Sequence, residues 1–214
     1  MNSLLAFQSH LKLAHCYWEQ QLQLGDCAID ATCGNGHDTL KLCELVLSLE
    51  GGKIFAFDIQ EDALKTTQNL VQSKLAANLL SQVTYINECH SDFKGPINRA
   101  LTCSDRFQLE PVKLIVYNLG YLPGGDKGLT TAVNTTLHSV QAAAELIAPG
   151  GLISITCYPG HPEGALEETA ILEMTASFSR FDWNCCHHRW INKKNAPSLL
   201  LLQKNMCIKN NTHN

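Results

Sequence analysis

The sequence predicts an α/β fold built on a mainly parallel sheet. Apolar runs of strand length alternate with helix-like segments through most of the chain, a pattern typical of parallel strands joined by crossover helices. Near the end, two strand-like segments flank a short turn, which predicts an antiparallel hairpin. We therefore expect a seven-stranded, mostly parallel sheet with helices on both faces and a C-terminal antiparallel hairpin.

The expected elements follow one another along the chain. Parallel strands are expected at residues 27–29, 53–57, 82–87, 112–117 and 152–157, and hairpin strands at 181–191 and 197–203 around a turn at 192–196. Helices are expected at 37–49, 61–78, 130–148 and 163–177, with helix plus loop at 93–111. Pro149, Gly150 and Gly151 form the stop after the long third helix.

The first 24 residues are amphipathic and are interrupted by Lys12, His15 and Glu19, so they do not resemble a signal peptide. We interpret them as a helix lying on the domain. A chain of 214 residues with 45% hydrophobic content suits one well-buried domain, here 1–214 with a polar tail at 205–214. No apolar run approaches the ~20 residues that span a bilayer. The expected location is the cytoplasm.

The ten cysteines predict reduced thiols rather than a disulfide framework. No Cys-x-x-Cys spacing occurs, so a structural zinc site has little support. The run from Cys185 to His188 is the place where we considered a metal site. Adjacent residues of a strand face opposite sides, so these four side chains cannot easily converge on one ion, and we expect no metal.

The charge of the chain is mildly acidic. A net charge of −4 argues against a broad, nonspecific grip on nucleic acid, but it leaves room for a local basic patch. The last fifth of the sequence is the most basic, with Arg189, Lys193, Lys194, Lys204 and Lys209. This region is either a solvated face with a polar tail or an edge that contacts RNA.

The stretch from Asp30 to Thr39 carries the strongest functional signal. It follows a short apolar run and opens a helix-like segment, and a glycine turn at that place binds nucleotides in open α/β sheets. Gly34 and Gly36 permit the turn and let backbone N–H groups approach a ligand. Asp58 ends the second strand, 22 residues after Gly36, where an acid can accept both hydroxyls of a ribose.

This arrangement resembles the nucleotide site of class I (Rossmann-like) methyltransferases, which use S-adenosylmethionine (AdoMet). Asp30 precedes the glycines as acid-x-x-x-Gly-x-Gly, and an acid there can hold the positively charged amino-acid end of AdoMet. A dinucleotide dehydrogenase is less favoured, because Thr39 stands where the third glycine of its fingerprint belongs. A strand, turn and helix with ordinary turn residues is the structural alternative. The predicted AdoMet-binding residues of the first two loops are Asp30, Thr32, Gly34, Asn35, Gly36, His37, Asp38, Thr39, Asp58, Ile59 and Gln60.

A second polar group follows the third strand. In the segment 87–92, an acid is expected to meet the exocyclic amine of adenine, and both Glu88 and Asp92 qualify. The register leaves the choice open, so Glu88, Cys89 and His90 are all predicted to contact the cofactor. Asp38 at the start of the first crossover helix is also a plausible helix cap.

The fourth strand ends in Asn118, and Tyr121 follows three residues later. The pattern resembles the Asn-Pro-Pro-Tyr motif of amino-methyltransferases, with Leu119 and Gly120 in place of the prolines. An amine that attacks a methyl group needs acceptors for its N–H bonds, which the Asn118 amide oxygen and a backbone carbonyl can supply. Tyr121 offers a face for base stacking. We expect Asn118 and Tyr121 to act in catalysis, with Asn118 also near the cofactor.

An alkylamine substrate must lose a proton before it attacks, because its conjugate acid has a pKa of about 10. A low-polarity pocket favours the neutral amine, and a general base could remove the proton. Asp126 and His161 lie in loops at the correct end of the sheet, and both are candidates. Lys127 and Glu163 are either solvated surface residues or substrate contacts.

Four segments together resemble one family, the YtqB-like "putative rRNA methylases", whose studied members methylate tRNA. They are 30–39, 57–60, 118–127 and 160–164, in matching order within a resemblance that covers residues 10 to 204. The resemblance implies AdoMet-dependent methylation of the 5-aminomethyl group of wobble (2-thio)uridine in tRNA to 5-methylaminomethyl. It implies a substrate-binding frame of Leu122, Pro123, Gly124, Gly125, Lys127, Tyr158, Gly160 and Glu163.

Other functions are compatible with the same residues. A methyltransferase acting on rRNA or on a small amine would use the same site, and a small amine would need no basic edge. A noncatalytic scaffold that binds AdoMet or another nucleotide belongs to a different class, and it predicts that Asn118→Ala changes no phenotype. A homodimer would enlarge the RNA-binding area of a small acidic domain, and we expect one.

Overall fold

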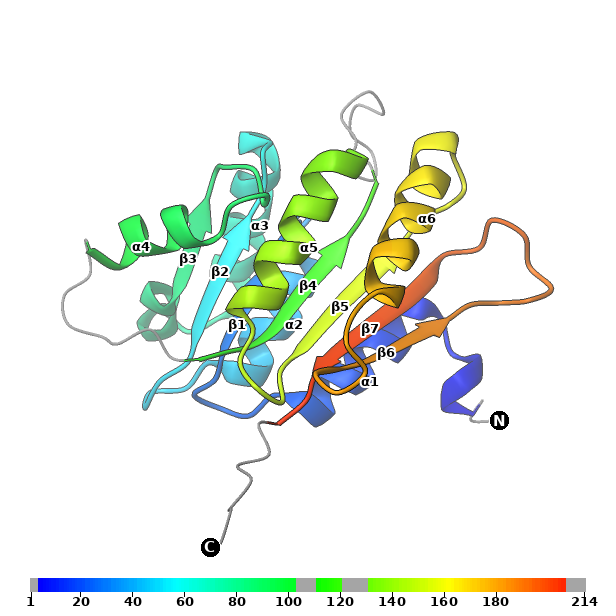
Figure 1. Cartoon of the computed structure of the whole chain (residues 1–214). Coiled ribbons are helices and arrows are strands. Elements are labelled where there is room, and N and C mark those ends of the chain that lie inside the picture. The colour runs from blue at the N-terminus through cyan, green and yellow to red at the C-terminus, as the bar shows by residue number, and fades with distance from the viewer. Residues whose placement is uncertain (1–3, 103–110, 121–130, 207–214) are drawn as a thin grey trace, which may run out of the picture.

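The computed structural model describes residues 4–102, 111–120 and 131–206. Within these residues, seven strands form one sheet in the order β3-β2-β1-β4-β5-β7-β6 (Figure 1). Strands β1 to β5 pair in parallel, and β7 runs antiparallel between β5 and β6. The predicted fold class is confirmed. The strands are β1 (Cys27–Asp30), β2 (Lys53–Phe57), β3 (Val83–Ile86), β4 (Val112–Asn118), β5 (Leu152–Cys157), β6 (Trp183–His188) and β7 (Ser198–Lys204).

Helices cover both faces of the sheet (Figure 1). One face carries α1 (His10–Gln21), α2 (His37–Val46) and α3 (Glu61–Lys74). The other carries α4 (Lys94–Thr102), α5 (Val133–Leu146) and α6 (Pro162–Ala176). Two short 3-10 helices complete the described elements, η1 (Leu5–Phe7) and η2 (Ala77–Gln82). The predicted N-terminal helix is present as α1 and packs against β4, β5 and β7.

The core lies in two layers because successive side chains of a strand face opposite sides of the sheet. In β1, Cys27 and Ile29 pack toward α4, α5 and α6, while Ala28 packs toward α1, α2 and α3. All three are fully buried. A strand covered on both faces is apolar throughout, which is why this segment has no polar alternation in the sequence.

Several boundaries differ from the predicted ones for local reasons. Helix α2 ends at Val46 rather than 49, because the chain turns at Ser48, whose N–H donates to the Gly51 carbonyl at 2.9 Å. Strand β6 begins at Trp183 rather than 181, because the Ser179 carbonyl holds a turn by accepting the Trp183 N–H at 2.9 Å. Strand β4 extends one residue further than expected, so Asn118 pairs with Thr156 of β5.

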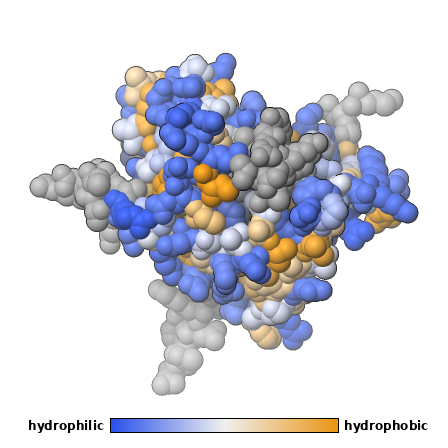
Figure 2. All heavy atoms as spheres, turned by 90° about the horizontal axis from the view of Figure 1, so that it is seen from above, coloured by the Kyte–Doolittle hydropathy of each residue, from blue (hydrophilic) through white to orange (hydrophobic). Residues whose placement is uncertain are grey.

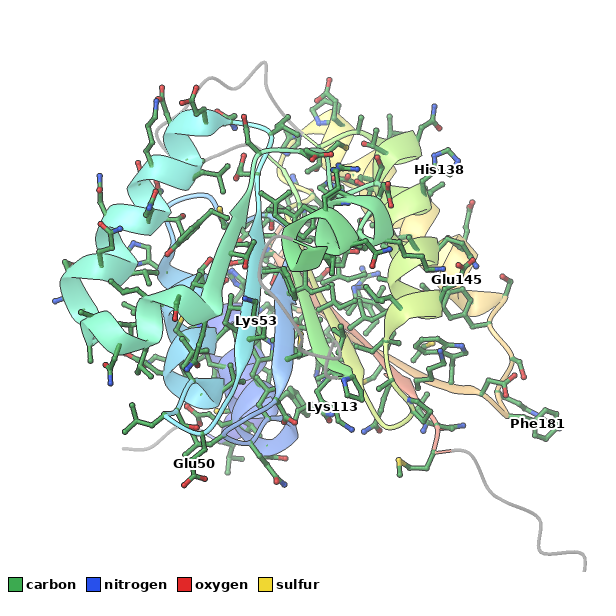
Figure 3. All side chains as sticks on the ribbon, turned by 90° about the vertical axis from the view of Figure 1, so that its left-hand side faces the viewer. Glu50, Lys53, Lys113, His138, Glu145 and Phe181 are labelled. Carbon is green, nitrogen blue, oxygen red and sulfur yellow. The ribbon has the colours of Figure 1, made fainter. Side chains whose placement is uncertain are left out.

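The carboxyl ends of the parallel strands form the upper edge of the sheet in Figure 1, and Figure 2 views the molecule from that side. There, hydrophobic residues are visible between hydrophilic ones. Lys53 and Lys113 lie at the opposite edge, near the starts of β2 and β4 (Figure 3). No helix in the described segments has the length and apolar character needed to cross a membrane.

The β6 segment from Cys185 to His188 alternates as a strand requires. Cys185 Sγ lies 3.8 Å from the Thr175 carbonyl of α6, and His187 Nε2 lies 3.6 Å from Glu168 of the same helix. His188 points to the other face, where its Nε2 lies 3.2 Å from the Tyr17 hydroxyl of α1. Among the described residues, no three His, Cys, Asp or Glu side chains gather as a metal site.

Candidate active site

A cavity of about 950 Å³ opens at the carboxyl ends of the parallel strands. Its walls come from the loops after β1 to β5, the start of α5, the β6–β7 loop and Leu11 of α1. This volume lies at the upper end of the range for small-molecule sites, ~300–1,000 Å³. The predicted residues that line it are Thr32, Gly34, Asn35, Gly36, His37, Asp38, Asp58, Ile59, Gln60, Cys89, His90, Asn118, Tyr158, Gly160 and His161.

The glycine turn after β1 is shaped by contact with α3. Gly36 has φ 84°, and a Cβ there would lie 2.7 Å from the backbone Cα of Thr67. No other residue fits that position without displacing α3. The N–H groups of both glycines have acceptors within the protein. The Gly34 N–H donates to Asp58 Oδ2 at 3.0 Å, and the Gly36 N–H donates to the Cys33 carbonyl at 2.8 Å.

Asp58 ends β2 and lines the cavity as predicted. Its Oδ2 accepts the Gly34 N–H at 3.0 Å, and its Oδ1 accepts the Gln60 N–H at 2.9 Å. A carboxylate has about four acceptor positions, so each oxygen keeps capacity for one more donor. Burial raises the pKa of Asp58, and these backbone donors counteract it. The carboxylate is therefore held rigidly while retaining one acceptor position on each oxygen for a diol.

Asp30 and Thr39 lie beneath the cavity rather than on its wall. Asp30 is fully buried, and its Oδ2 accepts the Thr39 hydroxyl at 2.6 Å while its Oδ1 accepts the Thr32 N–H at 3.2 Å. Burial, with the nearby Asp38 charge, raises the pKa of Asp30 to about 7. Asp30 does not line the cavity, and its contact with a ligand ammonium stays a prediction. In the structure, Asp30 instead ties the glycine turn to α2.

The loop after β3 presents different residues to the cavity than we expected. Glu88 is exposed and pairs with Arg99 at 2.7 Å, and Asp92 accepts the Gly95 N–H at 3.2 Å. Neither acid lines the cavity, because each is engaged with α4. Cys89 and His90 do line it. Burial lowers the pKa of His90 to about 4, so this ring is neutral at physiological pH.

Asn118 is the centre of a hydrogen-bonded chain that joins three elements. Its N–H donates to the Thr32 hydroxyl at 2.7 Å, and its Nδ2 donates to Asp38 Oδ2 at 2.7 Å. The other Asp38 oxygen accepts from His15 Nε2 of α1 at 2.8 Å. A carboxylate can only accept, so it fixes the Asn118 amide with the nitrogen toward Asp38. The amide oxygen is left as the acceptor for a ligand.

His161 begins α6 as its N-cap. Its Nδ1 accepts the Gly164 N–H at 3.1 Å, and Glu163 Oε2 lies 3.5 Å from the same nitrogen. An Nδ1 that accepts a hydrogen bond places the proton of the neutral ring on Nε2. In this tautomer Nε2 carries the ring proton, and the role of His161 as a general base stays a prediction. Glu163 is exposed and does not line the cavity.

Helix α1 contributes to the site more than the sequence indicated. His10 Nε2 lies 3.3 Å from the Tyr158 hydroxyl, and Leu11 lines the cavity. Burial lowers the pKa of His10 and raises that of Tyr158 to about 12, so both are neutral at pH 7. Histidines in an amphipathic helix carry no spacing that marks them as site residues, so sequence reasoning missed them.

A buried carboxylate supports the far wall. Glu167 of α6 accepts the Thr131 hydroxyl at 2.7 Å and a hydrogen bond from the Thr136 hydroxyl. The Thr131 oxygen accepts the Gly120 N–H at 2.8 Å, and the Thr131 N–H donates to the Gly120 carbonyl at 3.1 Å. Burial raises the pKa of Glu167. The chain ends at Gly120 and Thr131 are therefore joined to each other and to α6.

Seven predicted site residues lie outside the described part of the chain. They are Tyr121, Leu122, Pro123, Gly124, Gly125, Asp126 and Lys127. Other cavity residues were not predicted, among them Thr131, Thr135, Asn195 and Pro197. Asn195 has φ 58° and belongs to the turn of the C-terminal hairpin. The hairpin was expected, but nothing in the sequence placed its turn beside the cavity.

The strand order and the cavity position define a class of protein. The order reverses between β1 and β4, the switch point at which open α/β sheets bind ligands. Five parallel strands with β7 antiparallel between β5 and β6 form the class I methyltransferase fold. A putative methyltransferase from Streptococcus mutans, solved in complex with SAH, has this fold with a TM-score of 0.75 and 29% identity. That match covers 92% of this chain and 99% of the other.

The family model described as "Putative rRNA methylase" matches residues 54–204, so the chain belongs to that family. A putative rRNA methylase from Clostridium thermocellum is 32% identical with a TM-score of 0.79, over 92% of this chain and 98% of the other. The "tRNA (mnm(5)s(2)U34)-methyltransferase, chloroplastic" of Arabidopsis thaliana is 37% identical, over 90% of this chain and 68% of the relative. The predicted family resemblance is confirmed.

Proposed function

We propose that this protein is an AdoMet-dependent N-methyltransferase that converts the 5-aminomethyl group of the wobble (2-thio)uridine of tRNA to 5-methylaminomethyl. Two findings support the proposal: membership of the family, and the name of the Arabidopsis relative. The single observation that carries it is the orientation of Asn118, whose amide oxygen is left to accept from an amine. The anticodon of tRNA is the proposed binding region.

The cavity suits AdoMet on its β1–β2 side. Asp58 keeps one acceptor position on each oxygen, which matches the two ribose hydroxyls. Gly36, which packs against Thr67 of α3, lines the same side of the cavity. Cys89 and His90 form the wall where adenine would lie. When bound, AdoMet supplies an electrophilic methyl group on a positively charged sulfur.

The opposite side of the cavity would hold the amine. Asn118 Oδ1 accepts one N–H of the neutral amine, which directs the nitrogen lone pair away from Asn118 and toward the methyl donor. Fixing that direction is the main contribution of these residues, because alignment of the reacting atoms supplies much of the rate in group transfer. Apolar lining residues such as Leu11, Leu119 and Pro197 favour the neutral form of the amine.

The other polar groups act around this contact. His161 donates from Nε2 to a uracil oxygen or to a water, rather than removing the proton of the amine. Tyr158 stays protonated near neutral pH, since its pKa is raised to about 12, and it provides a second donor. Tyr121 and Asp126 remain predicted participants that lie outside the described residues, and the homodimer remains a prediction.

Nucleoside mass spectrometry tests the proposal. Bulk tRNA from a strain lacking this gene is digested before and after incubation with purified protein and AdoMet. The expected result is a gain of one methyl group on 5-aminomethyl-2-thiouridine. The family description favours rRNA as a second candidate, so rRNA from the same strain is treated in parallel. A methyl gain confined to rRNA nucleosides, or to an added small amine, would replace the tRNA proposal.

A further inference from the structure

The loop of the C-terminal hairpin, residues 189–197, borders the mouth of the cavity. Asn195 and Pro197 line the cavity, while Arg189, Ile191 and Lys193 of the same loop are exposed to solvent. The loop follows β6 at the right of Figure 1 and is seen as a hydrophilic lobe at the right of Figure 2. A molecule bound in the cavity through one nucleotide would therefore pass its neighbouring groups over this loop.

The charge of the hairpin loop is entirely positive. Arg189, Lys193 and Lys194 lie within nine residues that contain no Asp or Glu. Glu168 of α6 interacts with Arg189 and with His187, which precedes the loop. In the described part of the chain, neither Lys193 nor Lys194 forms an ion pair with a carboxylate. Several cations elsewhere are paired, as the contacts Lys41–Glu19, Lys65–Glu61, Lys94–Glu145 and Arg99–Glu88 show.

An aromatic residue fixes one of these cations. The Lys193 ammonium lies 3.8 Å from the centre of the Trp190 ring, within the range of a cation–π contact. The Trp190 ring in turn lies 6.2 Å from the Phe7 ring of η1. Both Phe7 and Ile191 are largely exposed. The loop therefore presents an ordered positive charge within an exposed apolar and aromatic surface.

We propose that the hairpin loop binds the phosphate backbone of the RNA strand next to the nucleotide whose base enters the cavity. This inference rests on the proposed function and adds the surface by which the acidic protein holds RNA. A net charge of −4 excludes attraction by the whole molecule, so affinity for a polyanion must come from a local group of unpaired cations. Lys193 and Lys194 of the hairpin loop are such cations, and the loop adjoins the cavity.

The test measures RNA binding separately from methylation. A fluorescein-labelled anticodon stem-loop RNA is titrated with the full-length protein by fluorescence anisotropy, over a series of salt concentrations. Lys193→Gln combined with Lys194→Gln should weaken binding about tenfold and reduce the slope of log K against log salt by about 1.5. Trp190→Leu should weaken it about two- to fivefold by releasing Lys193. AdoMet affinity should stay unchanged in all variants, which reports an intact fold.

Lys74→Gln combined with Lys113→Gln is the matched control, because it removes the same charge far from the loop. Lys74 ends α3, and Lys113 lies at the opposite edge of the sheet (Figure 3). The control should bind RNA within about twofold of wild type. The proposal is overturned if wild type and the loop variant bind the RNA with equal affinity. It is also overturned if wild type binds polyglutamate as tightly as it binds the RNA. If RNA binding depends on the loop but no methylation is detected, the proposed function is refuted and the RNA-binding role of the loop is retained.

Discussion

The two sides of the cavity are built in different ways. On the β1–β2 side, polar groups are joined over short stretches of chain: Asp30 and Thr39 are 9 residues apart, and Gly34 and Asp58 are 24 apart. On the β4–β5 side, the contacts span much longer separations. Asp38 and Asn118 are 80 residues apart, and His10 and Tyr158 are 148 apart. The first side is a local motif, and the second is assembled by the completed fold.

The difference also concerns which polar groups are left for a ligand. The β1–β2 side uses its donors internally, since the Gly34 and Gly36 N–H groups both have protein acceptors. It keeps acceptor capacity at Asp58. The β4–β5 side orients single groups, with the Asn118 amide held by Asp38 so that its oxygen can accept, and the His161 ring held by the Gly164 N–H. Binding of a cofactor suits the first arrangement, and alignment of a reacting group suits the second.

Asn118→Ala should have the largest effect on turnover. It removes the acceptor that directs the amine, and misalignment of this kind reduces kcat by about 100-fold. AdoMet affinity should change little, because the Asp58 side of the cavity is untouched. Single-turnover rates and isothermal titration would measure the two quantities. Asn69→Ala, at an exposed position of α3, is the control. A parallel loss of AdoMet affinity would place Asn118 at the cofactor instead.

Asp58→Ala should weaken AdoMet binding and leave kcat at saturating AdoMet largely unchanged. It removes a carboxylate that the structure holds with two backbone N–H donors and that would accept from the ribose. Hydrogen bonds to a charged group contribute about 2 kcal/mol, which predicts a roughly 30-fold weaker Kd for AdoMet. At saturating AdoMet, kcat should recover to near the wild-type value. A kcat that stays low under those conditions would mean that the two sides are not separable.

Asp38→Ala should have a smaller effect that depends on Asn118. Without the Asp38 acceptor, the Asn118 amide can flip, and we expect about a tenfold loss of kcat. His15→Ala removes the donor behind Asp38 and a ring contact with Trp18 but leaves the Asp38 acceptor in place, so the loss of kcat should be smaller still. In the double variant Asp38→Ala, Asn118→Ala, the loss should equal that of Asn118→Ala alone, because residues that act as a unit are not additive. Additive losses would give Asp38 a separate role at the ligand.

The sequence predicted the fold and the β1–β2 side because both depend on local patterns. Strand and helix alternation, the glycine turn and Asp58 are each visible within short windows. It also marked Asn118, through its place at the end of a strand. It could not predict the partners of Asn118, since His15 and Asp38 meet only when α1 folds across the sheet. Glu88 was also expected at the cavity, but it pairs with Arg99 of α4.

Asp30→Asn should change the pH dependence of stability rather than turnover. Burial raises the pKa of Asp30 to about 7, whereas an unfolded aspartate titrates near 4. The folded protein thus binds the carboxyl proton of Asp30 more tightly than the unfolded chain does. The stability that this proton contributes is present below pH ~4 and is lost as the pH rises toward ~7. Relative to Asp30→Asn, wild type should lose on the order of 1–4 kcal/mol of unfolding free energy between these limits.

Urea unfolding without AdoMet measures this difference, with the exposed Asp62→Asn variant as the control. Parallel curves of unfolding free energy against pH for wild type and Asp30→Asn would mean that the Thr39 hydroxyl and the Thr32 N–H are sufficient to keep Asp30 ionised. The β1–β2 side would then carry a buried negative charge capable of attracting the cofactor cation from beneath the cavity.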